Sequence, residues 1–133
     1  MRRVGRRSRD AAVLALCLAL GSFSCSSMEA DPPFSEFVVE VDSESFVARI
    51  ADPGTIVHFR EAIAGSRAGF PAGPLRSGDG GFNSPWTWHL DPEETRLVEA
   101  AIEVCDGRPS YVESHQNDFP TYCPWGARIV AER

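Results

Sequence analysis

Short runs of alternating hydrophobic and polar residues predict two strands near the start of the folded part of this chain. Residues 37–41 are rich in β-branched and aromatic side chains, and residues 46–50 place Phe46, Ala48 and Ile50 on one face. The polar stretch between the two runs indicates a turn. We therefore expect a hairpin or an extended pair of edge strands.

Apolar residues at helical spacing predict two helices, and each follows an Asp-Pro pair. The first helix begins at Asp52-Pro53 and ends at Gly65, and the second begins at Asp91-Pro92. An aspartate accepts hydrogen bonds from the free N–H groups of a helix start, and proline suits the first helical position. The buried stripes would consist of Ile56, Phe59, Ala62 and Ile63 in the first helix and of Leu97, Val98, Ala101, Ile102 and Cys105 in the second.

Three further strands complete the pattern. Residues 72–76 form a short strand that its prolines restrict to a sheet edge, residues 86–90 alternate cleanly, and residues 127–131 close the chain, while a glycine-rich loop covers residues 77–81. This order predicts an α+β fold. We expect a ferredoxin-like split βαβ sandwich, with two helices on one face of a small, mostly antiparallel sheet and an extra N-terminal strand.

The first 24 residues have the pattern of a bacterial export signal. Five arginines precede an apolar run over residues 11–20, which is too short to span a bilayer. Small residues then lead to Cys25, which predicts lipoprotein processing and acylation of the Cys25 thiol. Ordinary cleavage after Ser24 fits equally well and would give a secreted protein. Residues 25–33 form a polar, proline-terminated tether, and residues 34–133 form a single α+β domain of the cell envelope.

The cysteines support an oxidising compartment. Cys17 leaves with the signal, so Cys25, Cys105 and Cys123 remain. If Cys25 carries lipid, Cys105 and Cys123 are left as one disulfide pair. If it does not, one thiol stays free or pairs between chains.

Charge narrows the choice of partner. All 13 basic residues are arginine. Five of these arginines precede Cys25, but only one of the 19 acidic residues does. The chain from Cys25 onward therefore carries eight arginines and 18 acidic residues, which gives a net charge of −10. Such a domain repels nucleic acid and anionic lipid, so we expect no nucleic-acid partner and membrane contact only through the lipid anchor. The acidic surface is either simply solvated or attracts cations and basic partners.

Candidate chemistry is sparse. His89 faces away from the tryptophans of its strand and is either a base, a metal ligand or a hydrogen-bonded structural residue. Together with Tyr122 and Trp125, His89 forms a possible binding surface, where aromatic rings stack on a glycan or a peptide. The chain contains no nucleophile elbow, zinc motif, phosphate loop or Cys-x-x-Cys motif. We therefore expect no catalytic residues, no cofactor and no metal.

Four segments carry a family resemblance. They are Trp86 to Pro92, Ala101 to Asp106, Tyr111 to Glu113 and Tyr122 to Trp125. In these segments the chain resembles a family of small secreted domains that are labelled calmodulin-binding-protein-like in bacteria. The resemblance implies a compact α+β domain with a paired cysteine link and, through its label, calmodulin as a partner. It implies no catalytic residues.

The sequence thus predicts an exported, lipid-anchored binding or interaction module for an unknown protein or glycan ligand. One alternative is a small secreted hydrolase that uses His89 with a carboxylate partner. Another is an inhibitor of a secreted hydrolase, which would act through an exposed, ordered loop near Gly78.

Overall fold

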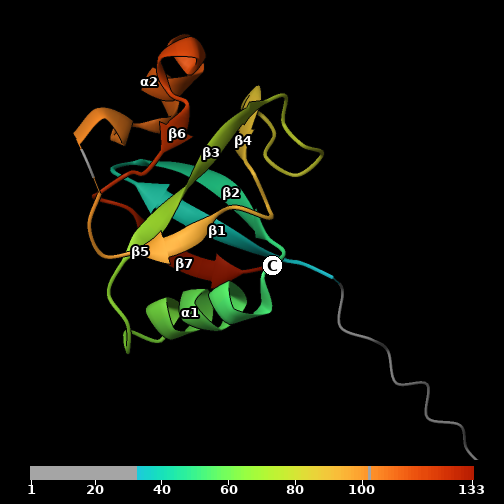
Figure 1. The fold of residues 1–133 in the computed structure, drawn as a ribbon, viewed down its shortest axis with the longest axis vertical. Coiled ribbons are helices and arrows are strands. Elements are labelled where there is room, and N and C mark those ends of the chain that lie inside the picture. The colour runs from blue at the N-terminus through green and yellow to red at the C-terminus, as the bar shows by residue number, and fades with distance from the viewer. Residues whose placement is uncertain (1–32, 102) are drawn as a thin grey trace, which may run out of the picture.

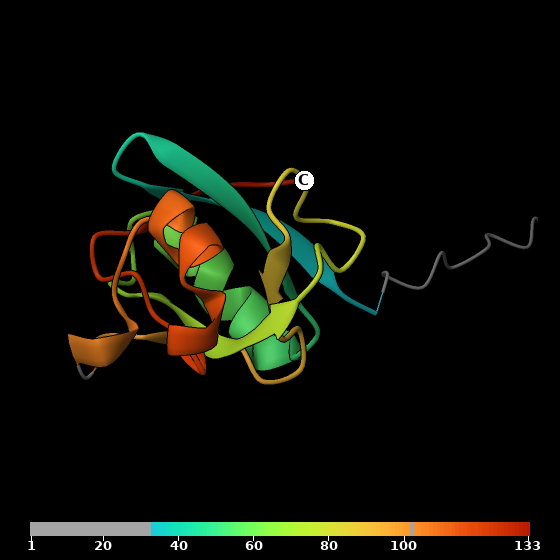
Figure 2. The ribbon, with the colours of Figure 1, turned by 90° about the horizontal axis from the view of Figure 1, so that it is seen from above.

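The computed structural model describes residues 33–101 and 103–133. The predicted signal, Cys25 and the tether up to residue 32 lie outside the described residues. The fold is α+β, as predicted: strands form two antiparallel sheets (Figures 1 and 2), and two α-helices lie at opposite ends of the described part (Figure 1). None of the described helices is long and apolar enough to cross a membrane.

The first sheet is built on the predicted hairpin. β1 (Ser35–Val41) pairs with β2 (Glu44–Ile50), and Val41 lies opposite Glu44 across a two-residue turn. The chain then returns at its end, where β7 (Arg128–Glu132) pairs with the other edge of β1. β1 is therefore central, and both ends of the described chain lie side by side (Figure 1).

The second sheet is built on β3 (Phe70–Ser77), which pairs in turn with β5 (Arg96–Val98), β6 (Thr121–Tyr122) and β4 (Trp88–Leu90). The prediction that prolines would place this strand at an edge is wrong. Proline lacks an N–H group but keeps its carbonyl, and the Pro74 carbonyl accepts a hydrogen bond of 2.9 Å from the Asp91 N–H.

The first predicted helix is confirmed as α1 (Pro53–Ile63). The Asp52 carboxylate accepts hydrogen bonds of 2.7 Å from both the N–H and the hydroxyl of Thr55. Beyond its C-cap, Gly65 adopts a positive φ of 76°, a conformation that costs glycine little.

The second predicted helix, over residues 91–105, is wrong. Asp91 starts a single turn, in which its carbonyl accepts the N–H of Thr95 at 3.0 Å, and the chain then enters β5. A short 3₁₀ turn, η1 (Glu103–Cys105), follows. The second α-helix is α2 (Pro109–Ser114), and a further 3₁₀ turn, η2 (Gln116–Asp118), comes after it.

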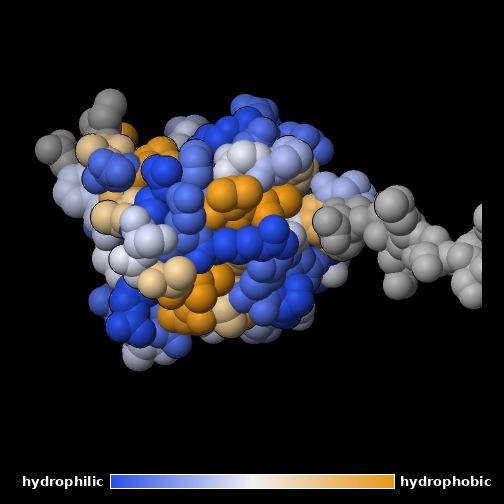
Figure 3. Space-filling model, turned by 90° about the horizontal axis from the view of Figure 1, so that it is seen from below, coloured by the Kyte–Doolittle hydropathy of each residue, from blue (hydrophilic) through white to orange (hydrophobic). Residues whose placement is uncertain are grey.

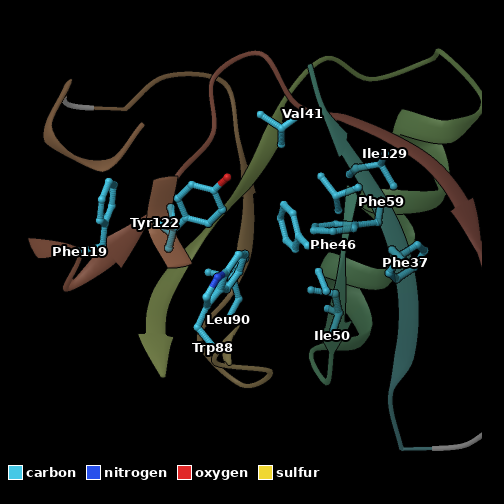
Figure 4. Packing of buried hydrophobic residues seen from close by; sticks show 13 residues of the cluster. Phe37, Val41, Phe46, Ile50, Phe59, Trp88, Leu90, Phe119, Tyr122 and Ile129 are labelled. Atoms are coloured by element: carbon cyan, nitrogen blue, oxygen red, sulfur yellow. The ribbon is translucent and has the colours of Figure 1, made fainter. Parts of the chain in front are cut away.

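The core fills the space between the sheets and the helices (Figure 4). Trp88 lies in it with no exposed surface, as the alternation of its strand predicted. With two sheets and helices at opposite ends, the ferredoxin-like arrangement of two helices on one sheet face is not confirmed. The buried cluster consists of Phe37, Val39, Val41, Phe46, Ala48, Ile50, Phe59, Trp88, Leu90, Val112, Phe119, Tyr122 and Ile129.

Candidate functional site

A disulfide joins Cys105 to Cys123, as the pairing argument predicted, with their Cα atoms 5.1 Å apart. The Cys123 N–H also donates a hydrogen bond of 2.7 Å to the Cys105 carbonyl. Both cysteines are buried. The disulfide therefore fixes the segment after η1 beside the segment after β6.

Next to this disulfide, Asp106 holds Trp125 in place. One carboxylate oxygen of Asp106, Oδ1, accepts the N–H groups of Gly107 and Trp125, each at 2.9 Å. The Ala127 N–H donates to the Pro124 carbonyl at 3.1 Å and closes a turn around Trp125. Trp125 is 42% exposed, so a fixed backbone presents a large aromatic side chain to solvent.

α2 presents a second exposed ring close to the same segment. Tyr111 is 50% exposed, and its ring stacks on His115 with centroids 4.0 Å apart. A Cβ atom placed on Gly107 would lie 3.4 Å from Cδ1 of Tyr111, so Tyr111 adjoins the segment that Asp106 caps. We call Asp106, Tyr111, His115 and Trp125 the α2 surface.

Carboxylate hydrogen bonds hold α2 at both ends, one set involving Glu44 of β2 and one set involving Glu113 of α2 itself. Glu44 of β2 accepts the N–H of Ser110 at 2.7 Å and its hydroxyl at 2.6 Å. These hydrogen bonds, the hydroxyl first, lower the pKa of Glu44. Glu113 accepts the N–H of Thr87 at 3.0 Å and its hydroxyl at 2.6 Å. The helix that carries Tyr111 is therefore tied to both sheets.

Tyr122 was predicted to contribute to a binding surface, but the structure buries it completely (Figure 4). Its hydroxyl donates a hydrogen bond of 2.7 Å to the Gly107 carbonyl. Burial first, and then the nearby carboxylates of Asp106, Glu44 and Asp42, raise the pKa of Tyr122. Tyr122 therefore supports the α2 surface from below and does not face a ligand.

His89 lies under the glycine-rich loop. Its Nδ1 is 2.6 Å from the Gly78 carbonyl, and its ring meets Phe82 edge-on with centroids 5.4 Å apart. A Cβ atom placed on Gly80 would come within 2.9 Å of the His89 ring, so the loop passes directly over it. No carboxylate of the described residues contacts His89 through a hydrogen bond or an ion pair, and no such contact or ring contact joins it to Trp125. The structure therefore does not bring these two predicted site residues together.

The glycine-rich loop itself is exposed and ordered. The Asp79 carbonyl accepts the N–H groups of Phe82 at 3.2 Å and of Asn83 at 2.9 Å, and the Asp79 carboxylate accepts the Gly81 N–H at 2.9 Å. At its start, the Gly78 N–H donates to the Thr87 carbonyl at 2.7 Å. The loop has the exposure and the order that the inhibitor hypothesis requires.

A groove that sequence reasoning missed lies between the start of β1 and α1. Its volume is about 930 Å³, and its lining includes Phe34, Ile56 and Val57. The guanidinium of Arg49 lies between the rings of Phe34 and Phe82, at 4.2 and 4.3 Å from their centroids. The α1 side of the molecule shows apolar patches divided by hydrophilic side chains (Figure 3).

The arginines of this groove already bind carboxylates of the chain. Glu36 forms ion pairs with Arg49 at 2.6 Å and with Arg133 at 2.9 Å, and Arg60 pairs with Glu132 at 2.7 Å. Folding brings these residues together from segments that are far apart in the sequence. No local motif therefore predicts the arrangement. Nowhere in the described part of the chain do three or more His, Cys, Asp or Glu residues gather as a metal site.

Comparison with known proteins identifies a family. Residues 33–133 match the family of BP-74 N-terminal domains. This match covers all of the described fold and confirms the predicted resemblance at the level of the family. No curated protein and no solved structure matches the chain.

Proposed function

This chain belongs to the BP-74 N-terminal domain family, and we propose that it is an exported, lipid-anchored binding module whose ligand contacts the α2 surface. The observation that carries the proposal is the exposure of Tyr111 and Trp125 on backbone that the disulfide and Asp106 hold in place. Aromatic side chains have few rotatable bonds, so ordering them on a ligand costs little conformational entropy.

Export is supported by the sequence and is compatible with the disulfide. The basic segment, the apolar run and the small residues before Cys25 have the order of an export signal. Disulfides persist mainly in oxidising compartments. The domain would then reach its ligand outside the cytoplasm.

A second candidate function is inhibition of a secreted hydrolase by the loop at residues 77–81. The observation that favours it is the exposed backbone held by the hydrogen bonds of Asp79 and Gly78. The alternative hydrolase function finds no comparable support, because the hydrogen-bond partner of His89 is a carbonyl. Calmodulin is an acidic protein that typically binds basic helices, so charge disfavours it as the partner of this acidic domain.

Nuclear magnetic resonance of the mature chain with Cys25→Ser tests the binding proposal. The probes are chito-oligosaccharides and short peptides, and the reporters are the indole N–H signals. We expect a probe to shift the Trp125 signal and to leave the Trp86 signal unchanged. The Trp86 indole N–H is already engaged, because it donates to the Ser45 carbonyl at 2.8 Å. In Trp125→Ala, where the backbone amide signals of α2 replace the lost indole reporter, binding should be roughly tenfold weaker or more, as for an aromatic hot spot.

The matched control is Val57→Ala, which removes an exposed apolar side chain on α1, at the other end of the molecule. It should leave binding unchanged. The proposal fails if no probe moves the Trp125 signal, or if Val57→Ala weakens binding as much as Trp125→Ala does.

A further inference from the structure

Some carboxylates of the described chain form ion pairs with arginine, and others do not, both around α2 and elsewhere (Asp52, Asp79, Glu93 and Glu99). Ion pairs with arginine involve Glu36, Glu40, Glu61, Asp91, Glu94 and Glu132. No ion pair within the described residues involves the carboxylates around α2, which are Asp42, Glu44, Asp106, Glu113 and Asp118. Arg108, the residue before α2, acts on Glu44 through its charge but forms no ion pair, so no cation of the described domain is in direct contact with these carboxylates.

Three of these carboxylates act electrostatically on one group, the Tyr122 hydroxyl, which donates to the Gly107 carbonyl beneath the α2 surface. Burial first, and then the charges of Asp106, Glu44 and Asp42, raise the pKa of Tyr122. Glu44 is occupied by Ser110. Asp106 uses only Oδ1 in hydrogen bonds with described residues, and the residue is exposed, so Oδ2 faces no partner among them.

The exposed aromatic rings beside Asp106 attract cations, as the carboxylate does. The face of an aromatic ring carries negative electrostatic potential and attracts guanidinium and ammonium groups. Trp125 offers exposed ring surface next to a carboxylate that can accept hydrogen bonds from the same cation, and Tyr111 offers the ring surface that His115 does not cover. Both parts of the α2 surface therefore favour a positively charged group.

We propose that the α2 surface binds a basic peptide segment, in which an arginine or lysine side chain lies against Trp125 or Tyr111 and donates to the Asp106 carboxylate. This inference rests on the proposed function and specifies the chemistry of its ligand. The groove at the other end is a poorer site for the same ligand, because its carboxylates, Glu36 and Glu132, are already paired with arginine.

The test compares two peptides on the mature chain with Cys25→Ser. One is an acetylated hexapeptide of alternating glycine and arginine, and the other has citrulline in place of each arginine, which keeps the shape and removes the charge. The arginine peptide should move the Trp125 indole signal and bind at least about fivefold more tightly than the citrulline peptide, as expected for a cation on an aromatic ring. Added salt should weaken its binding.

Asp106→Asn is the diagnostic variant, because an amide oxygen can still accept the two backbone N–H groups that Asp106 caps. We expect it to bind the arginine peptide about three- to tenfold more weakly, consistent with loss of a charge-assisted hydrogen bond. Glu93→Gln is the control, since it removes the same negative charge at a position near α1. The adjacent Pro92 lies beside the start of α1, because its carbonyl accepts the Ala51 N–H. Glu93→Gln should bind as the parent does.

Each outcome separates the two proposals. Equal binding of the citrulline peptide, or unchanged binding by Asp106→Asn, overturns the basic ligand and leaves the aromatic surface standing. Movement of the Trp125 signal by chito-oligosaccharide but by neither peptide also overturns the basic ligand and supports a glycan. If none of the probes moves Trp125, both proposals fail.

Discussion

Asn83 connects the two sheets through a buried side chain. Its Oδ1 accepts the N–H of Val47 in β2, and its Nδ2 donates to the carbonyl of Trp88 in β4, both at 2.7 Å. The residue has no exposed surface. A buried backbone group without a hydrogen-bond partner costs free energy. The side-chain amide of Asn83 supplies partners to two such groups, the Val47 N–H and the Trp88 carbonyl.

We therefore expect Asn83→Ala to destabilise the domain by about 2–4 kcal/mol, the cost of two unsatisfied buried groups. Urea unfolding of the variant and the parent measures the difference. Asn117→Ala is the control, because Asn117 is exposed, and it should change stability little. A loss no larger than that of the control would contradict the role given to Asn83.

For single residues, the sequence predicted which face of a strand some side chains occupy, but not which other segments pack against them. The alternation over residues 86–90 correctly placed Trp88 inside and His89 on the other side. It could not show that the loop at Gly80 folds back over His89. Nor could it show that the polar residue Tyr122 would be buried against the rings of Phe46, Trp88 and Phe119. Those features depend on contacts between segments distant in sequence.

At the scale of the elements, the N-terminus of helix α2 is capped by Glu44, a residue of strand β2. The residue before α2, Arg108, forms no side-chain cap, and Glu44 binds Ser110 instead. The hydrogen bonds lower the pKa of Glu44 from its ordinary value of 4.5. A lowered pKa means stabilisation that is present above the ordinary pKa and lost as the pH falls through the lowered one.

Glu44→Gln should therefore be less stable than the parent at pH 7, and the difference should shrink as the pH falls below about 4.5, the ordinary pKa of the group. Thermal unfolding at a series of pH values measures it. Glu99→Gln is the control, because the Glu99 carboxylate has no hydrogen bond or ion pair with a described residue. A stability difference that is the same at every pH would count against the charged cap.

The two Asp-Pro pairs show where prediction of elements succeeds and fails. Asp52 caps α1 and the helix continues, as its apolar spacing predicted. Asp91 also caps a turn, through the N–H groups of Glu93 and Glu94, but it forms an ion pair with Arg76 of β3 at 2.9 Å. Residues 96–98 then pair with β3, so sheet formation overrides the local preference for a helix.

At the scale of the whole molecule, the proposed binding surface lies away from the proposed anchor. The described chain begins beside its C-terminal end, where the Arg133 N–H donates to the Glu36 carbonyl at 3.0 Å, whereas α2 lies at the far end of the molecule (Figure 1). A tether attached at Pro33 would leave the α2 surface free to meet a ligand in front of the membrane.

The anchor can be tested directly. Growth with a palmitate analogue should label the wild-type protein, and Cys25→Ala should lose the label and pass from the membrane fraction into the soluble fraction, since acyl chains supply the membrane affinity. The Cys105–Cys123 disulfide should persist in both proteins, which serves as the control for export. Equal labelling of the two proteins would rule out acylation at Cys25.

The central position of β1 also orders the events of folding. β1 and β2 can pair as soon as residue 50 is available, but the other edge of β1 waits for β7, about ninety residues further along the chain. Ile129, which closes the core beside β1, arrives with it. A polypeptide threaded through a membrane with its N-terminus first would thus remain without a complete first sheet until its last segment had crossed. The topology therefore delays completion of the first sheet in such a chain until β7 has reached the far side.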